Sequence, residues 1–131
     1  MKRVLVVDDN EANIHLVGFI LKKHGFEVIE ARDGTEGVAL AIKEKPDLIL
    51  MDIQLPDITG LEAARMIRAS EADGKVPIIA LTSFAMTGDR EKALAAGCNG
   101  YMAKPIHVET FIAEIQQYLQ VHSVQRAGAG I

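Results

Sequence analysis

The sequence has a single cysteine, Cys98, and no apolar run approaching the roughly 20 residues that span a bilayer. One thiol cannot form an intramolecular disulfide or a zinc cluster. The first apolar run, residues 4–7, stops at Asp8 and is too short for the core of a signal peptide. These absences exclude a disulfide scaffold and argue against a membrane partner, and they make the cytoplasm the expected location.

The sequence also lacks the composition of a nucleic-acid-binding or disordered chain. Its 18 acidic residues outnumber the 14 basic ones, so the net charge of −4 argues against nucleic acid as a partner. Hydrophobic residues make up 49% and charged residues 24%, which is ordinary for a globular protein. The length of 131 residues suits one domain, and no internal repeat is present.

What the sequence does contain is an alternation of short apolar runs and longer amphipathic segments. Apolar runs rich in valine, isoleucine and leucine are typical of strands buried on both faces of a parallel sheet. We predict strands over residues 4–7, 26–31, 47–51, 76–81 and 100–103. We predict helices over residues 10–24, 33–44, 59–70, 85–96 and 106–120.

Strands that alternate with helices imply an α/β fold with helices on both faces of an open parallel sheet. Five strands in a chain of this length favour a flavodoxin-like (βα)5 three-layer sandwich with strand order 2-1-3-4-5. On the first predicted helix, Leu16, Val17, Ile20 and Leu21 form the expected core-facing stripe. Residues 1–120 are predicted to form the domain, and residues 121–131, which lose the helical periodicity, a flexible tail.

Polar residues follow four of the predicted strands at their carboxyl ends. Ligands of open α/β sheets bind beyond these ends, so we expect the polar groups to converge on one rim. The groups are Asp8 and Asp9 after the first strand, Asp52 after the third, Thr82 and Ser83 after the fourth, and Lys104, which precedes Pro105, after the fifth.

The chemistry of this set indicates phosphoryl transfer. Carboxylates brought together need a counter-charge, and oxygen ligands favour a hard cation such as Mg²⁺. A divalent ion, Lys104 and Thr82 would supply three partners for phosphoryl oxygens. A carboxylate can itself accept the group as an aspartyl phosphate. Asp8 and Asp9 are paired as a metal clamp would be, whereas Asp52 stands alone, so we assign Asp52 as the acceptor.

Four separated motifs resemble those of the receiver domain of bacterial response regulators, in order and in spacing. They are VLVVDDN, LILMDIQLPDITG, IIALTSFAM and GYMAKPI, and the resemblance covers residues 3 to about 120. The segments IQLP, SFAM and YMAKPI are also similar to DivK-type single-domain regulators and to the receivers of hybrid histidine kinases. The sequence leaves both of these groups open.

The resemblance implies that Asp52 accepts phosphate from a phosphohistidine on a histidine kinase or a histidine phosphotransfer protein. It implies that Asp9 and Asp52 bind Mg²⁺ directly, that Asp8 binds it through water, and that the Gln54 backbone carbonyl is a further ligand. The protein would then be no enzyme, beyond catalysing its own phosphorylation and slow dephosphorylation.

The resemblance assigns further roles around the phosphate. Thr82 would be the switch hydroxyl, Tyr101 the aromatic side chain that turns inward with it, and Lys104 the lysine that binds the phosphate. The Lys104–Pro105 peptide would be cis, as X-Pro bonds can be. Gln54 and Phe84 occupy the two positions at which receivers tune phosphate lifetime. We expect Phe84 to shield the acyl phosphate, because its ring cannot hydrogen-bond a hydrolytic water.

Two surfaces are candidates for partner proteins. On the first predicted helix, Ile14 stands about 200° from the core stripe, so we expect it to be exposed and, with Asn10 and Ile106, to dock a kinase. The expected output face is the fourth helix, fifth strand and fifth helix, which would bind a downstream protein target. Its candidate residues are Arg90, Glu91, Tyr101, His107 and Val108.

The function predicted from all of this is a single-domain response regulator, a monomer or weak dimer, that signals by phosphorylation-dependent protein binding. If the chain is complete, the residues after about 120 are too few for an output domain. A receiver segment of a hybrid histidine kinase is the first alternative. A haloacid-dehalogenase-type phosphohydrolase is less favoured, because position 10 is asparagine where that family's Asp-x-Asp pattern has its second aspartate.

Overall fold

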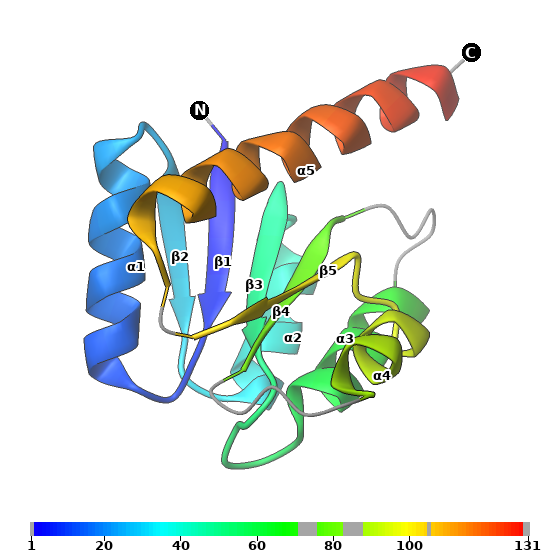
Figure 1. Cartoon of the computed structure of the whole chain (residues 1–131). Helices are drawn as coiled ribbons and strands as arrows, with labels where there is room; N and C mark the ends of the chain where they lie inside the picture. Colours follow the sequence, from blue (N-terminus) through cyan, green and yellow to red (C-terminus); the bar gives the residue numbers. More distant parts are fainter. Residues whose placement is uncertain (1, 71–75, 83–87, 105, 130–131) are drawn as a thin grey trace.

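Five parallel strands form one sheet in the order β2-β1-β3-β4-β5, as the sequence predicts (Figure 1). The computed structural model describes residues 2–70, 76–82, 88–104 and 106–129, with side chains as far as residue 120. The strands are β1 (Arg3–Val7), β2 (Glu27–Ala31), β3 (Leu48–Asp52), β4 (Ile78–Thr82) and β5 (Gly100–Ala103).

Helices cover both faces of this sheet, which gives the predicted three layers. They are α1 (Glu11–Lys23), α2 (Gly34–Glu44), α3 (Gly60–Ser70), α4 (Asp89–Ala95) and α5 (Val108–Ala129). Buried side chains of α1 and α5 form one core cluster with one face of the strands. Those of α2, α3 and α4 form a second cluster with the other face. The central strands are buried on both sides, which explains their continuous apolar sequences.

The register of the sheet brings the carboxyl ends of the strands together. Val7 pairs with Met51, so Asp8 comes directly beside the end of β3. Asp52 pairs with Leu81, and Thr82 pairs with Ala103, so the ends of β4 and β5 lie next along the same rim. The predicted convergence of the polar residues therefore follows from the order and register of the strands.

Side-chain caps fix where three of the helices begin. The Asn10 side chain accepts a hydrogen bond from the Asn13 N–H at 3.2 Å, and Asp33 accepts one from Glu36 at 2.7 Å. The Thr59 hydroxyl accepts one from the Glu62 N–H at 3.1 Å. Such caps satisfy N–H groups that have no partner within the helix. They begin α1, α2 and α3 shortly after the carboxyl ends of β1, β2 and β3.

The predicted core face of α1 is wrong in one respect. Ile14 is 1% exposed and belongs to the core, whereas Leu16 is 49% exposed. The buried stripe follows the spacing of Ile14, Val17 and Leu21, three and four residues apart, and this spacing excludes position 16. The predicted docking role of Ile14 fails, because it requires an exposed side chain.

Two helix boundaries also differ from the predictions. α4 begins at Asp89, and the earlier residues of its predicted range, 85–87, lie outside the described residues. α5 begins at Val108 and continues as helix to Ala129, past the predicted end at residue 120. No proline or β-turn signal interrupts residues 121–129, so the backbone hydrogen-bonding pattern can continue beyond the sheet (Figure 1). The division into a domain and a flexible tail stays a prediction.

No helix in the described part of the chain is long and apolar enough to cross a membrane.

Candidate functional site

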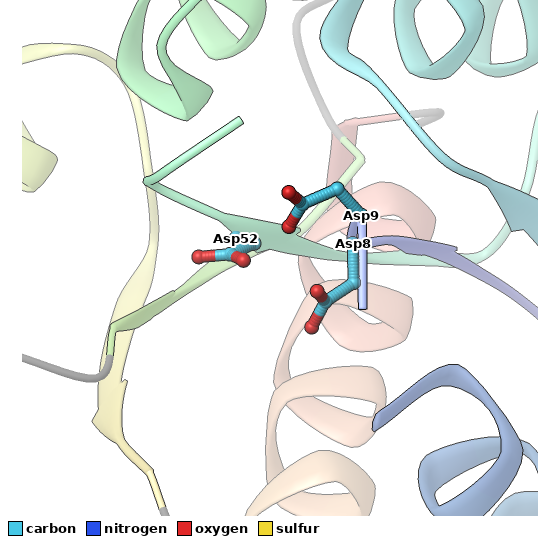
Figure 2. Close-up of side chains that lie close together, drawn as sticks. All are labelled: Asp8, Asp9 and Asp52. Atoms are coloured by element: carbon cyan, nitrogen blue, oxygen red, sulfur yellow. The ribbon is translucent and has the colours of Figure 1, made fainter. Parts of the chain in front are cut away.

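Three carboxyl groups gather at the carboxyl ends of β1 and β3 (Figure 2). Asp8 and Asp9 follow β1, and Asp52 is the last residue of β3. One carboxylate oxygen from each lies within 4.8 Å of the others. Asp8 is 2% and Asp52 4% exposed, whereas Asp9 is open to solvent. Two of the carboxylates are thus fixed in the protein, and the third faces the side from which a ligand would come.

Lys104 joins the two buried carboxylates. Its Nζ donates to Asp8 Oδ2 at 2.9 Å and to Asp52 Oδ2 at 3.3 Å, and its side chain is 11% exposed. Lys104 reaches this position because it follows β5 directly, and its N–H donates to the Thr82 carbonyl at 2.7 Å. The ammonium that the sequence predicts at this rim is therefore in direct contact with the predicted phosphoacceptor.

The other oxygen of each buried carboxylate accepts a hydrogen bond from the backbone. Asp8 Oδ1 accepts from the Asn10 N–H at 2.9 Å, and Asp52 Oδ1 accepts from the Gln54 N–H at 3.1 Å. Aspartate commonly bonds the backbone two residues on in this way. Each side chain is therefore held at both oxygens, one by its own loop and one by Lys104, and its orientation is set before any ligand binds.

Burial raises the pKa of the Asp52 carboxyl, and the nearby charge of Asp8 adds to this. The Gln54 N–H and Lys104 act in the opposite direction without cancelling the effect. Burial would lower the pKa of Lys104, but its hydrogen bond to Asp8 and the charge of Asp52 raise it overall, so the ammonium stays charged. One cation faces three acidic groups, an imbalance that a divalent ion would relieve.

Thr82 and Tyr101 lie on the adjoining strands. Thr82 ends β4 and is 3% exposed. Tyr101 pairs with Ala80 and packs, half-buried, against the core cluster of α2, α3 and α4. Its hydroxyl oxygen is buried and has no hydrogen-bond partner among the residues that the structure describes. A buried hydroxyl without a hydrogen-bond partner costs free energy. A change of conformation that gave the Tyr101 hydroxyl a partner would therefore be favourable.

Several predicted site residues cannot be placed or lie apart from the cluster. Phe84 and Pro105 are outside the described residues, so the predicted shielding and the cis peptide stay predictions. Gln54 meets the site through its backbone, and its side chain is exposed. Asn10 is exposed and Ile106 half-buried beside the cluster, while Ile14 is in the core.

A small pocket of about 70 Å³ lies between α1 and the acidic cluster. Asn13, Leu16 and Ile106 line it together with Asp8 and Lys104. Leu16 is not among the residues predicted for docking, because the apolar pattern of the sequence assigns it to the core face of α1. The helical spacing counted from Ile14 identifies Leu16 as exposed, since positions 14, 17, 18 and 21 form one helical stripe without position 16.

Four of the five predicted output residues are exposed, and Tyr101 is half-buried. Arg90 and Glu91 on α4 and His107 and Val108 near the start of α5 are exposed. A pocket of about 240 Å³ lies between β5 and α5, and Tyr101 and His107 are among its lining residues. The role of these residues in binding a target stays a prediction.

Asp57, in the loop between β3 and α3, is a further residue that the sequence does not single out. Its carboxylate accepts hydrogen bonds from the N–H groups of Gly34 and Thr35, each at 2.8 Å. The Pro56-Asp57 pair indicates a turn, but nothing local indicates a partner more than twenty residues earlier.

Comparison with known proteins agrees with this geometry. The profile of the response regulator receiver domain matches residues 4–116. The chain belongs to the response regulator receiver family. It is 44% identical to the polar-differentiation response regulator DivK of Brucella anthropi over 118 residues, which are 90% of this chain and 96% of that protein. It is 45% identical to the DivK of Brucella ovis with the same coverage.

Solved receiver structures share the fold. A CheY-like response regulator receiver domain protein from Methanospirillum hungatei JF-1 superposes with a TM-score of 0.89 at 30% identity, covering 95% of this chain and 98% of that chain. The receiver domain of a sensor histidine kinase from Pseudomonas aeruginosa PAO1 has a TM-score of 0.84 at 39% identity and covers 91% and 98%. That structure has a magnesium ion coordinated in its active-site cleft.

The raised pKa of Asp52 predicts how its removal changes stability. A carboxyl whose pKa is raised by folding stabilises the folded state below its unfolded pKa, and this contribution is lost as pH rises through the folded pKa. Without Mg²⁺, we therefore expect Asp52→Asn to raise the free energy of unfolding at pH 7 by on the order of 1 kcal/mol. The gain should disappear near pH 4, about the unperturbed pKa of aspartate.

Denaturant unfolding in the presence of EDTA, followed by circular dichroism at both pH values, measures this effect. Asp9→Asn is the matched control, because Asp9 carries the same charge in the same cluster but is exposed. A stability of Asp52→Asn at or below that of the unmodified protein at pH 7 would contradict the account.

Proposed function

We propose that this protein is a phosphoacceptor switch of a two-component phosphorelay and that Asp52 accepts the phosphoryl group. The observation that carries the proposal is the position of the Lys104 ammonium, in contact with Asp52 and Asp8 beside the carboxylate of Asp9. This arrangement places a nucleophilic oxygen, a fixed cation and oxygen ligands for a metal at one rim. Family membership supports the same role.

The residues present fit Mg²⁺ as the cofactor. Asp8, Asp9 and Asp52 offer oxygen ligands within 4.8 Å of one another, and Mg²⁺ prefers a site of few carboxylates with water and substrate oxygens. The Gln54 backbone carbonyl, two residues past Asp52, would be a further ligand. When bound, the ion neutralises charge on the phosphoryl oxygens. The Pseudomonas receiver, with magnesium in its cleft, supports this assignment by similarity.

The transfer itself exchanges one bond for another. A carboxylate oxygen of Asp52 attacks phosphorus, the bond between phosphorus and the nitrogen of the donor's phosphohistidine breaks, and that nitrogen leaves with the electron pair and takes a proton. The product is an acyl phosphate on Asp52. Lys104 then exchanges its contact with Asp52 for one with a phosphoryl oxygen, and the Thr82 hydroxyl donates to another.

The partner that donates the phosphoryl group would dock beside α1. Asn13, Leu16 and Ile106 line the pocket that opens next to Asp8 and Lys104, and Leu16 is 49% exposed. An exposed leucine beside a polar reaction site suits the apolar face of a helical bundle, the kind of domain that carries a phosphohistidine in a histidine kinase or phosphotransfer protein. Asn10, at the start of α1, is at the edge of this surface.

The signal would leave through α4, β5 and α5. Movement of Thr82 toward the phosphate would change the space beside β5. The Tyr101 ring could then adopt a second conformation in which its buried hydroxyl gains a hydrogen-bond partner. The exposed residues Arg90, Glu91, His107 and Val108 would then present a changed surface to a target protein. The output is protein binding, and the only reactions catalysed are self-phosphorylation and slow dephosphorylation, with Gln54 and Phe84 tuning the latter.

The DivK relatives, matched over 96% of their own length, favour a single-domain regulator over a hybrid-kinase receiver. We further propose that the protein acts in the cytoplasm, as a monomer or weak dimer.

The first test is phosphorylation by a small donor. Incubation with acetyl phosphate and Mg²⁺ should add one phosphoryl group to the protein, detected by intact mass, and hydroxylamine should remove it. Asp52→Asn should abolish the adduct, because an amide cannot form an acyl phosphate. Asp9→Asn keeps the acceptor but loses an expected metal ligand, and it should slow labelling by about 10-fold or more. An adduct that persists in Asp52→Asn would contradict the proposal.

The docking surface is tested by Leu16→Glu. We expect phosphotransfer from a histidine kinase to slow by about 10-fold or more, the loss of roughly 1.4 kcal/mol or more of interface energy. Labelling by acetyl phosphate should change much less, because a small donor does not need a docking surface. The measurement is radiolabel transfer from the purified phosphorylated kinase.

The matched control is Ile42→Glu. Ile42 is also 49% exposed, but it lies on α2, on the other side of the sheet. Equal slowing by both variants would show that position 16 has no special role in docking.

A further inference from the structure

The loop between β3 and α3, residues 53–59, is attached to the start of α2 by one carboxylate. Asp57 Oδ1 accepts from the Gly34 N–H and Oδ2 from the Thr35 N–H, both at 2.8 Å, and the Thr35 hydroxyl also donates to Oδ2. The neighbouring Ile58 side chain fills the space that Gly34 leaves open. A Cβ at position 34 would lie 2.4 Å from Ile58 Cγ1.

The same loop carries part of the proposed metal site. It starts directly after Asp52, and the Gln54 N–H is bonded to Asp52 Oδ1. Its base is closed by the Gly60 N–H, which donates to the Ile53 carbonyl at 2.8 Å. A Cβ at Gly60 would lie 2.1 Å from the Asp52 carbonyl oxygen, so the two ends of the loop touch. The loop is thus fixed at its base by Ile53 and Gly60 and at its tip by Asp57.

The N-terminus of α2 has a capping residue besides Asp57. Asp33 already accepts a hydrogen bond from the Glu36 N–H at 2.7 Å and is the N-cap of this helix. The hydrogen bond from Thr35 holds the pKa of Asp57 well below its usual range, so this carboxylate is charged at neutral pH and suits the positive end of the helix. The distinctive consequence of the Asp57 contact is therefore the position of the loop.

We propose that Asp57 is a positioning residue for Mg²⁺: by fixing the loop tip on α2 it holds the Gln54 backbone in place beside Asp52. This inference rests on the proposed function, in which the Gln54 carbonyl binds the ion. Groups that orient metal ligands without touching the metal typically change affinity by 10- to 100-fold when removed. α2 thereby acts as a fixed support for a site at the carboxyl ends of β1 and β3.

The test is Mg²⁺ binding to the full chain by isothermal titration calorimetry, with Mg²⁺ alone as the ligand. We expect Asp57→Ala to raise the dissociation constant about 10-fold, at the low end of the range for such groups. Asp33→Ala is the matched control, because it removes a carboxylate from the same helix end that accepts its hydrogen bond from Glu36, within α2, instead of fixing the loop. It should lower the melting temperature while leaving the Mg²⁺ dissociation constant unchanged.

Two further variants keep the test decisive. Asp57→Asn keeps the size of the side chain and one accepting oxygen, so it should fold even if Asp57→Ala does not, with an intermediate dissociation constant. Asp57→Glu keeps both oxygens and should restore part of the affinity. With acetyl phosphate as donor, the Mg²⁺ concentration for half-maximal labelling should rise in Asp57→Ala while the maximal rate changes little.

Two negative outcomes have different meanings. If the unmodified protein binds Mg²⁺ and is labelled, but Asp57→Ala or Asp57→Asn matches Asp33→Ala in Mg²⁺ affinity, the positioning role is overturned and the proposed function stands. If the unmodified protein neither binds Mg²⁺ nor is labelled on Asp52, the proposed function itself is overturned, and this inference falls with it.

Discussion

The contact between Lys104 and two buried carboxylates is the interaction on which the site depends. Asp8 and Asp52 are almost fully buried, and adjacent carboxylates in such a place need a counter-charge. Lys104 supplies that cation from the end of β5, two strands away from β3 in the sheet. Asp9 adds a third carboxylate to this cluster, so the group could hold a metal ion.

The strand order makes this contact possible, and the loops refine it. β1 and β3 are neighbours, so their last residues adjoin, and β4 places Thr82 between them and β5. Each buried carboxylate is then oriented by an N–H two residues further along its own loop. One of these loops is fixed in turn on α2 by Asp57. The geometry expected to receive the phosphoryl group is thus supported from both faces of the sheet.

The fold and the central residues could be predicted from sequence because they depend on local patterns. Continuous apolar runs identify buried strands, and parallel strands necessarily bring Asp8, Asp52, Thr82 and Lys104 to one rim. The sequence predicts the opposite burial of Ile14 and Leu16. Both are apolar, and only the rotational position of each residue around the helix axis decides which one faces the core. Asp57 was missed because its partners, Gly34 and Thr35, belong to a helix that only tertiary packing brings near. The helical path of residues 121–129 was missed because low apolar periodicity does not prevent helix formation.

The central claim is that Asp52 receives the phosphoryl group and that Lys104 then leaves Asp52 to bind it. A crystal structure of the full chain with Mg²⁺ and beryllium trifluoride, which imitates the phosphoryl group, tests this most directly. The account predicts beryllium bonded to a carboxylate oxygen of Asp52, Mg²⁺ in contact with Asp9, Asp52 and the Gln54 carbonyl, and Lys104 Nζ on a fluoride. Beryllium on another residue, or Lys104 still bonded to Asp52 beside it, would contradict the account.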